Sequence, residues 1–291
     1  MFSVAGILFI TLSRAAVSAP VVLEAESGAV AGSAKTVDDP AASGQRAVSF
    51  GTGGGGGTTD NKPNGNITGN WKQTFNDDFN GTTLNSTVWG VDDQGGNNED
   101  ETACFSPEAV SVSGGNLEIS LTNKPCHGKA NMGGQIYTKQ FKQSYGFFEA
   151  RINLPGRNGR TYNFPAFWIL PYRGDAVCWP TGGEFDIMET IGGGASAHYG
   201  YGRSCDNVSN GWPGADPGGG DWTGWHTFAV DWQPGNFTVY YDGKKVGSPI
   251  NDQGVTNPMN VVIDNVSRPM GGETVTGTKI QVDYVRVWQK Q

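Results

Sequence analysis

Short runs in which apolar and polar residues alternate recur along the chain from about Trp71 to its end. A period of two is typical of β-strands with one buried face, and no window of a dozen residues carries the apolar stripe of an amphipathic helix. About fourteen candidate strands, punctuated by Gly, Asn and Pro, predict one all-β domain over residues 71–291, an antiparallel β-sandwich. The clearest runs are AVSVS (109–113), NLEISL (116–121), GFFEARINL (146–154), FTVYYDGKKV (237–246) and IQVDYVRVW (280–288).

The chain before Trp71 has a different composition. An apolar run of about nine residues followed by small residues predicts a signal peptide over residues 1–19, and hence a secreted, extracellular protein; a membrane span requires about twenty. Residues 20–50 contain LEAESG and ASGQRAVSFG, which resemble the opening of a family of calcium-binding carbohydrate-binding modules. This part is either a remnant of such a module or a spacer. Five consecutive glycines mark residues 51–70 as a Gly-rich linker.

Composition narrows the possible partners and cofactors. The 20 basic and 28 acidic residues give a formal net charge of −8, which argues against nucleic acid because phosphate binding requires clustered Lys and Arg. The three histidines and four cysteines show neither HExxH nor CxxC spacing, and no GxGxxG follows a strand and opens a helix. We therefore expect no catalytic cofactor and no nucleic-acid partner. We also expect a monomer without a membrane partner.

The positions of the cysteines predict two disulfides. Cys104 and Cys126 are centred on a Gly-Gly turn, and Cys178 and Cys205 are centred on Ile191–Gly194, so a hairpin would bring each pair together. We therefore predict pairs 104–126 and 178–205 among the three possible connectivities. Export also makes glycosylation an expectation at six Asn-x-Ser/Thr sites: Asn66, Asn80, Asn85, Asn207, Asn236 and Asn265.

Residues 179–191, WPTGGEFDIMETI, place Glu184, Asp186 and Glu189 within one strand pattern. Acidic residues are depleted in strands and like charges on one face repel, so such a cluster requires a function or a solvated face. The neighbouring residues are bulky and apolar, which argues against an exposed acidic edge. In a regular strand Glu189 would point away from the other two. We therefore predict a one-residue bulge at Ile187–Met188, which places all three carboxyls on one face of a cleft.

Two carboxyl groups on either side of a glycosidic bond can hydrolyse it. One attacks the anomeric carbon, and the other protonates the leaving oxygen. Asp186 lies between the two glutamates, where its negative charge would help to keep Glu189 protonated and a hydrogen bond would orient Glu184 as the nucleophile. The three residues are the candidate catalytic group.

WPTGGEFDIME resembles the active-site signature of glycoside hydrolase family 16, in its bulged Glu-x-Asp-x-x-Glu form. The resemblance runs from about Trp71 to Gln291 and implies a β-jelly-roll sandwich with a concave substrate cleft. It also implies retaining endo-hydrolysis of a β-linked polysaccharide, with Glu184 as nucleophile and Glu189 as acid/base. Further segments fall in the family's order: GNNED (96–100), YGFFEARINLPGRNG (145–159), PAFWILP (165–171), GWHTFAVDWQPGNFTVYYDGKKV (224–246) and VDYVRVW (282–288).

Within the family, the bulged motif, the Trp-Pro before it and Asn97–Glu99 look most like laminarinases, which cut β-1,3-glucan. The resemblance thus implies an endo-1,3-β-glucanase acting on laminarin-type or mixed β-1,3/1,4-glucan. Agarases and carrageenases also carry the bulge, so a β-galactan hydrolase is an alternative, as is a transglycosylase using the same glycosyl-enzyme. A non-enzymatic β-glucan-recognition protein of this fold would be expected to lack one or both glutamates, and both are present.

Five further residues are candidates for binding. Trp168 and Trp179 can stack on the apolar face of a pyranose, with core packing as the alternative for each. His198, on the strand after the acidic one, and Asn98, at a family position that contacts sugar, are the other expected substrate ligands. Asp283 matches a family position that helps to hold a structural Ca²⁺, an ion that requires six or more oxygen ligands.

Overall fold

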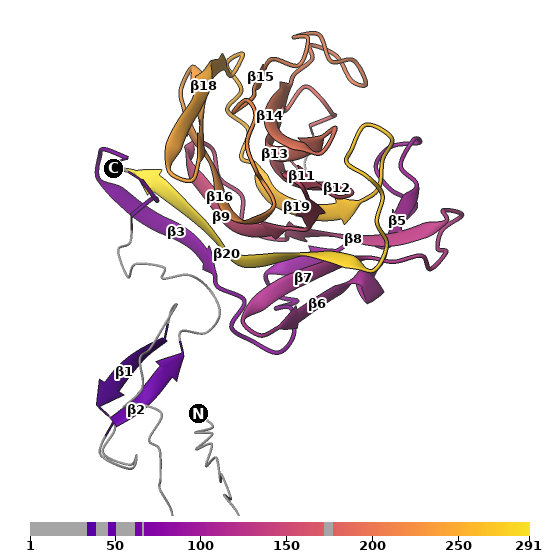
Figure 1. Cartoon of the computed structure of the whole chain (residues 1–291). Coiled ribbons are helices and arrows are strands. Elements are labelled where there is room, and N and C mark those ends of the chain that lie inside the picture. Colours follow the sequence, from indigo (N-terminus) through magenta and orange to yellow (C-terminus); the bar gives the residue numbers. More distant parts are fainter. Residues whose placement is uncertain (1–33, 39–45, 51–61, 66, 172–176) are drawn as a thin grey trace, which may run out of the picture. The chain divides into compact units, whose positions relative to one another are not determined.

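The computed structural model describes residues 34–38, 46–50, 62–65, 67–171 and 177–291. Contacts divide the chain into two units, residues 1–58 and 59–291. In the first unit, β1 (Ala34–Asp38) and β2 (Arg46–Phe50) form an antiparallel hairpin (Figure 1). The predicted signal peptide and the glycine run of the predicted linker lie outside the described residues, so both stay predictions.

The described end of the predicted linker packs on the larger unit. The backbone N–H of Asn64 donates to Glu149 at 3.2 Å, and its side-chain amide donates to Thr227 at 3.2 Å. Gly65 lies so close to Gly243 that a Cβ would be 2.6 Å from the carbonyl oxygen of Gly243. This part of the chain therefore belongs to the folded domain, which begins before Trp71.

Two eight-stranded sheets form the larger unit, in agreement with the predicted β-sandwich (Figure 1). The first, here called the cleft sheet, has the order β15-β14-β13-β12-β19-β8-β4, with β5 parallel to β8. Its strands are β4 (Trp89–Val91), β5 (Ala103–Phe105), β8 (Asn131–Thr138), β12 (Phe164–Leu170), β13 (Glu184–Ile191), β14 (Gly194–Gly200), β15 (Gly214–Ala215) and β19 (Asn260–Val266).

The second sheet, here called the back sheet, has the order β18-β17-β16-β9-β20-β7-β6, with β3 beside β20. Two short strands, β10 (Gly156–Arg157) and β11 (Arg160–Thr161), pair separately, and the only helical element of the described residues is the 3₁₀ turn Pro107–Ala109. The back-sheet strands are β3 (Trp71–Asp77), β6 (Val110–Ser113), β7 (Asn116–Leu121), β9 (Gly146–Leu154), β16 (Gly224–Gln233), β17 (Asn236–Tyr241), β18 (Lys244–Asn251) and β20 (Thr278–Lys290).

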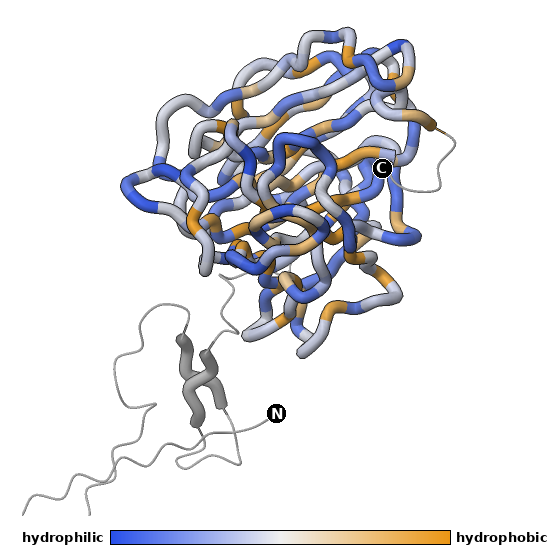
Figure 2. The backbone as a smooth tube through the Cα atoms, turned by 90° about the vertical axis from the view of Figure 1, so that its right-hand side faces the viewer, coloured by the Kyte–Doolittle hydropathy of each residue, from blue (hydrophilic) through white to orange (hydrophobic). Residues whose placement is uncertain are grey.

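The core lies between the two sheets, where alternate positions of each strand meet. Orange apolar and blue polar positions are interspersed along the backbone of the domain in Figure 2. Phe185 and Ile187 of β13 are fully buried there, and the Phe185 ring stacks on Phe237 of β17 with ring centroids 4.2 Å apart. Side chains alternate between the two faces of a strand, and the inward face of β13 is apolar. The carboxyls of this strand therefore point to the outer face of the cleft sheet.

One of the six predicted glycosylation sites is buried. Asn265 of β19 is inaccessible, and its side-chain amide donates to the carbonyl of Ile119 at 2.9 Å. Glycosylation at this position is therefore incompatible with the folded domain, which corrects that expectation. The sites at Asn80, Asn85 and Asn207 are exposed and stay predictions.

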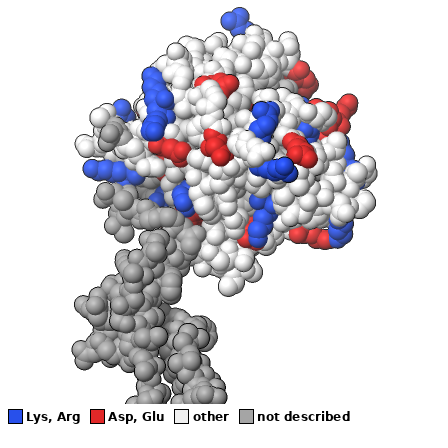
Figure 3. Space-filling view, in the orientation of Figure 1, with Lys and Arg blue, Asp and Glu red and all other residues white. Residues whose placement is uncertain are grey.

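The surface carries charges of both signs. Basic and acidic side chains are interspersed on the face shown in Figure 3, so neither sign dominates that face. In the part of the chain that the structure describes, no helix has the length and apolar character needed to span a membrane.

Candidate active site

A cleft of about 710 Å³ lies on the outer face of the cleft sheet. This volume is within the range of ligand-binding sites, roughly 300–1,000 Å³. The strands β12, β13, β14 and β19 provide its floor, and loops provide its walls. Its lining residues are Asn97, Asn98, Glu101, Phe164, Ala166, Trp168, Leu170, Trp179, Glu184, Asp186, Glu189, Ile191, His198, Trp212, Asp264, Val266, Arg268 and Met270.

The acidic strand β13 contains the predicted bulge. Between Asp186 and Glu189 the register with β14 shifts, so that Ile187 and Met188 together oppose a single residue. Ile187 and Met188 are buried in the core, whereas Glu184, Asp186 and Glu189 all line the cleft. The extra residue therefore restores the side-chain parity and brings the three carboxyls to one face.

A tyrosine from the back sheet stabilises the bulge. A bulge leaves backbone groups without a partner in the ladder, and buried backbone groups require one. The hydroxyl of Tyr241, at the end of β17, donates to the carbonyl of Ile187 at 2.9 Å, and Tyr241 is buried. Tyr241 thus holds the bulge from the core side, a contact that was not predicted.

The three carboxyls interact electrostatically. Burial raises the pKa of Glu184 to about 7; the hydrogen bond from Trp179 and the charge of Arg268 act against this shift, and the charge of Glu189 adds to it. Burial also raises the pKa of Asp186 well above its usual value, and Glu189 and Glu184 raise it further. Burial and the mutual repulsion of the carboxyls thus both favour the protonated forms of Glu184 and Asp186.

Large apolar side chains surround the carboxyls. Trp179, Trp212 and Met270 are the large hydrophobic residues that stand exposed in the described structure, with 42%, 39% and 40% of their surface accessible, and all three line the cleft. The two indole rings lie 6.4 Å apart at 36°, and the Trp179 Nε1–H donates to Glu184 Oε2 at 3.0 Å. Exposed aromatic faces in a polar cleft are typical of a ligand surface.

The floor of the cleft holds two more predicted binding residues. Trp168 is mostly buried, and its Nε1–H donates to Asp264 Oδ2 at 2.8 Å. Burial raises the pKa of Asp264 well above its usual value, although the hydrogen bond from Trp168 opposes this. His198 Nδ1 lies 3.5 Å from Glu189 Oε2. Both predicted residues therefore lie beside carboxyls, and Trp168 combines core packing with a place in the cleft.

Asn98 lines the cleft from a loop that carboxylates hold in place. Glu101 accepts hydrogen bonds from the Asn98 backbone at 3.2 Å, the Asn98 side chain at 2.8 Å and the Asn97 backbone at 3.0 Å. On the same loop, Asp100 accepts from the Nε of Arg268 through both carboxylate oxygens, at 2.9 and 3.0 Å. These contacts fix the position of Asn98 relative to the strands.

The sequence model of the family described as "Glycosyl hydrolases family 16" matches residues 97–286, which is more than half of the chain and includes the whole acidic strand. The chain belongs to glycosyl hydrolase family 16. The family suggested by the WPTGGEFDIME motif is thereby confirmed.

Curated relatives of this family 16 chain include two bacterial enzymes. Glucan endo-1,3-beta-glucosidase A1 of Niallia circulans is 28% identical over 268 residues, covering 75% of this chain and 38% of the relative. Endo-1,3-1,4-beta-glycanase ExsH of Rhizobium meliloti is 26% identical over 253 residues, covering 74% and 51%. The chain thus spans 38% and 51% of the length of these two relatives.

Solved structures share the fold. The non-specific endo-beta-1,3(4)-glucanase SCLam matches with a TM-score of 0.67 at 23% identity, over 79% of this chain and 95% of that chain. The laminarinase catalytic domain from Thermotoga maritima matches with a TM-score of 0.65 at 20% identity, over 76% and 99%. These likenesses confirm the predicted jelly-roll sandwich of family 16.

The surroundings of Asp283 do not fit the calcium site expected from family 16. Asp283 lies on β20 of the back sheet, and its carboxylate accepts a hydrogen bond from Arg151 at 3.0 Å; the guanidinium of Arg151 also lies over the Trp225 ring, 4.5 Å from its centroid. The described residues contain no group of three or more His, Cys, Asp or Glu that can hold a metal. The guanidinium of Arg151 thus occupies the place beside Asp283 where a calcium ion was expected.

Several residues of the cleft were missed by sequence reasoning. Asp264 lies in an apolar run, VVIDNV, and the argument used for β13 applies equally to it, since a carboxyl in a strand of bulky apolar residues requires a reason. Glu101 directly follows the GNNED motif. Trp212, Arg268 and Met270 lie in loops or turns, where no periodic pattern marks them.

Both predicted disulfides are present, Cys104–Cys126 and Cys178–Cys205. The second directly precedes Trp179, whose carbonyl also accepts a hydrogen bond from the backbone of Asp206, next to Cys205, at 2.8 Å. A covalent bond and a hydrogen bond thus hold the Trp179 segment beside the cleft.

Replacing Cys178 and Cys205 by serine is expected to lower the free energy of unfolding by about 3 kcal/mol, because the bond closes a loop with a sequence separation of 27. For a domain of this size the melting temperature should fall by roughly 6–12 °C, measured by calorimetry. Ser204→Ala, which changes an exposed neighbour, should retain the wild-type melting temperature. Equal melting temperatures for the wild type and the double variant would contradict the prediction.

Proposed function

We propose that this chain is a retaining endo-glycosidase that hydrolyses β-1,3-glucan. The observation that supports this best is the bulge in β13, which brings Glu184, Asp186 and Glu189 to one face of a cleft lined by exposed tryptophans. Two carboxyls on one face can act on opposite sides of a glycosidic bond. The names of the two curated relatives, a glucan endo-1,3-beta-glucosidase and an endo-1,3-1,4-beta-glycanase, support the same linkage class.

In the proposed mechanism, Glu184 attacks the anomeric carbon while Glu189 protonates the leaving oxygen. Glu189 then removes a proton from the water that resolves the glycosyl-enzyme. The Trp179 Nε1–H holds Glu184 for the attack, and His198 beside Glu189 is placed to orient that carboxyl. Asp186, whose pKa is raised by burial and by both glutamates, shares a proton with its neighbours. The chemistry requires no cofactor.

For substrate binding we propose Trp168, Trp179, His198 and Asn98, all of which line the cleft. Five carboxyls also line it, and Arg268 is its one Lys or Arg. Such a site disfavours sulfated galactans, whose negative charges would be repelled. This charge balance favours a neutral glucan over carrageenan.

Product analysis on laminarin, lichenan, agarose and carrageenan tests the substrate. We expect soluble oligosaccharides from laminarin, also from mixed-linkage lichenan, and none from carrageenan. Oligosaccharides of several different lengths early in the reaction would indicate cleavage at internal bonds of the polysaccharide. Glu184→Gln, which keeps the size of the side chain, is the matched control and should release nothing. Release from agarose but not from laminarin would overturn the proposed substrate.

Trp179→Phe tests the proposed contact with the nucleophile. Because the indole N–H favours the ionised form of Glu184, its loss should raise the pKa of Glu184 further. The acidic limb of kcat/KM against pH should therefore move to higher pH, by roughly one unit. Trp212→Phe, which removes an indole N–H that makes no hydrogen bond to a described carboxyl, is the control and should leave this limb in place. If the acidic limb of kcat/KM against pH stays at the wild-type position in both variants, the proposed contact is refuted.

Export of the chain is also a proposal. It is supported by the two disulfides, which form in oxidising compartments, and by the apolar N-terminal run. N-terminal sequencing of protein recovered from culture medium should begin close to Pro20. Recovery only inside cells with residues 1–19 intact would refute export.

A further inference from the structure

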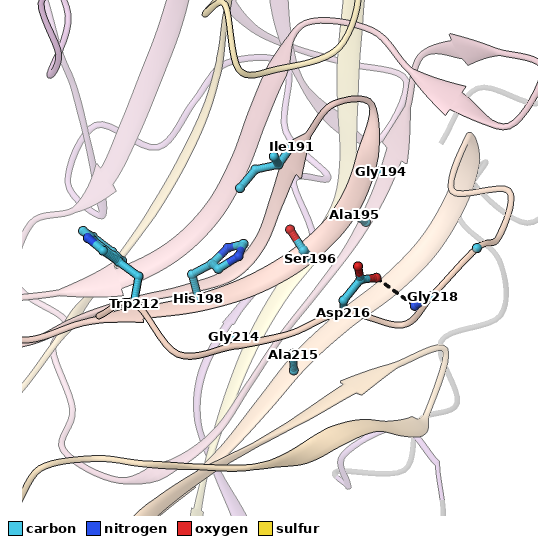
Figure 4. A pocket seen from close by; sticks show the side chains of 11 residues that line it. Ile191, Gly194, Ala195, Ser196, His198, Trp212, Gly214, Ala215, Asp216 and Gly218 are labelled. Carbon is cyan, nitrogen blue, oxygen red and sulfur yellow. Dashed lines mark hydrogen bonds between the residues drawn. The ribbon is translucent and has the colours of Figure 1, made fainter. Parts of the chain in front are cut away.

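A second groove, of about 500 Å³, adjoins the cleft beside β14 and β15 and is here called the β15 groove (Figure 4). Ile191, His198 and Trp212 line both the groove and the cleft, so the two spaces are direct neighbours. In Figure 4 the Trp212 and His198 rings lie toward one end and the Asp216 carboxylate toward the other, with the Ser196 hydroxyl between them.

The lining of the β15 groove suits a neutral, hydroxyl-rich ligand. Its small residues, among them Ala195 and Ala215, leave the space open, and no Lys or Arg lines it. One carboxylate oxygen of Asp216 accepts the backbone N–H of Gly218 at 2.7 Å, and the other makes no hydrogen bond to a described residue. A carboxylate, a hydroxyl and an indole face are the groups that typically bind a sugar.

The catalytic geometry directs a bound polysaccharide toward this groove. Glu184 and Glu189 act on opposite sides of the scissile bond and follow one another along β13, so the sugar chain must cross the strands rather than run along them. β14 and β15 are the next strands in this direction. Neighbouring strands lie about 4.8 Å apart, so β15 is about 10 Å from the acidic strand, within reach of a neighbouring sugar unit.

We propose that the β15 groove is an outer subsite that binds a glycosyl residue of the main polysaccharide chain beyond the scissile bond. Asp216 and Ser196 accept hydrogen bonds from its hydroxyls, and Trp212 packs against the sugar where the chain enters from the cleft. The pairing of β14 with β15, His198 with Gly214 and Ala197 with Ala215, brings Ser196 and Asp216 to the same end of the groove. This inference rests on the proposed endo-glycosidase function.

Two variants change the groove without touching the carboxyl cluster. Asp216→Asn keeps the size of the side chain and an oxygen for the turn to Gly218, but removes the charge. A Cβ at Gly219 would meet no atom within 4 Å and needs no unusual backbone angle, so Gly219→Leu narrows the groove without strain. Asp221→Asn is the matched control, because Asp221 makes the same kind of turn contact, to the backbone of Thr223 at 2.9 Å, and does not line the groove.

The test is kcat/KM for linear β-1,3-gluco-oligosaccharides of increasing length. In the wild type we expect a step increase when the chain becomes long enough to reach the groove. The ratio of kcat/KM for long and short substrates should fall roughly tenfold in Asp216→Asn and in Gly219→Leu, the effect of one lost charge-assisted hydrogen bond or one blocked subsite. Asp221→Asn should keep the wild-type ratio.

Two results would overturn the subsite. The first is a wild-type ratio of kcat/KM for long and short linear substrates in both groove variants. The second comes from a parallel assay on branched laminarin: a loss of kcat/KM confined to that substrate would assign the groove to a side branch instead of the main chain. A wild-type protein inactive on every oligosaccharide would instead refute the proposed function itself. Activity of the wild type on short substrates therefore distinguishes failure of the subsite proposal from failure of the proposed endo-glycosidase function.

Discussion

Replacing Glu184 by alanine is expected to lower kcat on β-1,3-glucan by roughly 10⁴-fold or more, because the variant lacks the proposed nucleophile. The truncated side chain leaves room beside the anomeric carbon for a small anion. Added azide should therefore restore turnover and form a glycosyl azide of inverted configuration, since a single displacement occurs. The rate against azide concentration and the NMR spectrum of the product measure both effects.

Glu101→Ala is the matched control for this experiment. Glu101 is another carboxyl of the cleft, but it accepts hydrogen bonds from the loop of Asn97 and Asn98 and does not lie on the acidic strand. Its variant should show weaker binding without any response to azide. A Glu184→Ala protein that keeps more than about a tenth of the wild-type kcat would contradict the assignment.

The arrangement of the carboxyls was predictable because strand geometry is strict. Side chains alternate between the faces of a strand, so three carboxyls at spacings of two and three residues share a face only if one residue is extra. The structure places that residue at Ile187–Met188, as predicted. The same regularity made the two sheets and the pairing of cysteines across hairpins predictable.

The walls of the cleft were not predictable in this way. Trp212 and Arg268 lie in loops, so their positions depend on loop conformation. The alternation of apolar and polar residues does not predict which loop packs over which strand. Tyr241 alternates normally along β17, so its hydrogen bond to the bulge appears only when the two sheets are packed together. The burial of Asn265 is also a tertiary effect.

Two interpretations changed because of electrostatic partners. We expected a negative charge on Asp186 from the sequence, and that role stays a prediction; in the fold, burial and two neighbouring glutamates raise the pKa of Asp186, which disfavours the charged form. Asp283 was expected to meet a calcium ion and instead pairs with Arg151, whose partner in the fold is set by the register of β9 and β20. In both cases the sequence identified the carboxyl but not the charge that faces it.

Replacing Glu189 by alanine is expected to lower kcat/KM on glucan by roughly 10²–10⁴-fold, because the leaving oxygen loses its proton donor. Aryl glycosides with good leaving groups need little protonation, so their first step should be spared.

In this variant Glu184 still forms the glycosyl-enzyme, and azide should attack it to give a glycosyl azide of retained configuration, the opposite of the Glu184→Ala product. Asp264→Asn is the control, because Asp264 lies on β19, with β12 between it and the acidic strand, and asparagine keeps an oxygen for the Trp168 N–H; it should keep the wild-type dependence on the leaving group. Retention in the wild type requires two displacements, so a first-formed product of inverted configuration, followed by NMR, would show that both glutamates have been assigned the wrong roles.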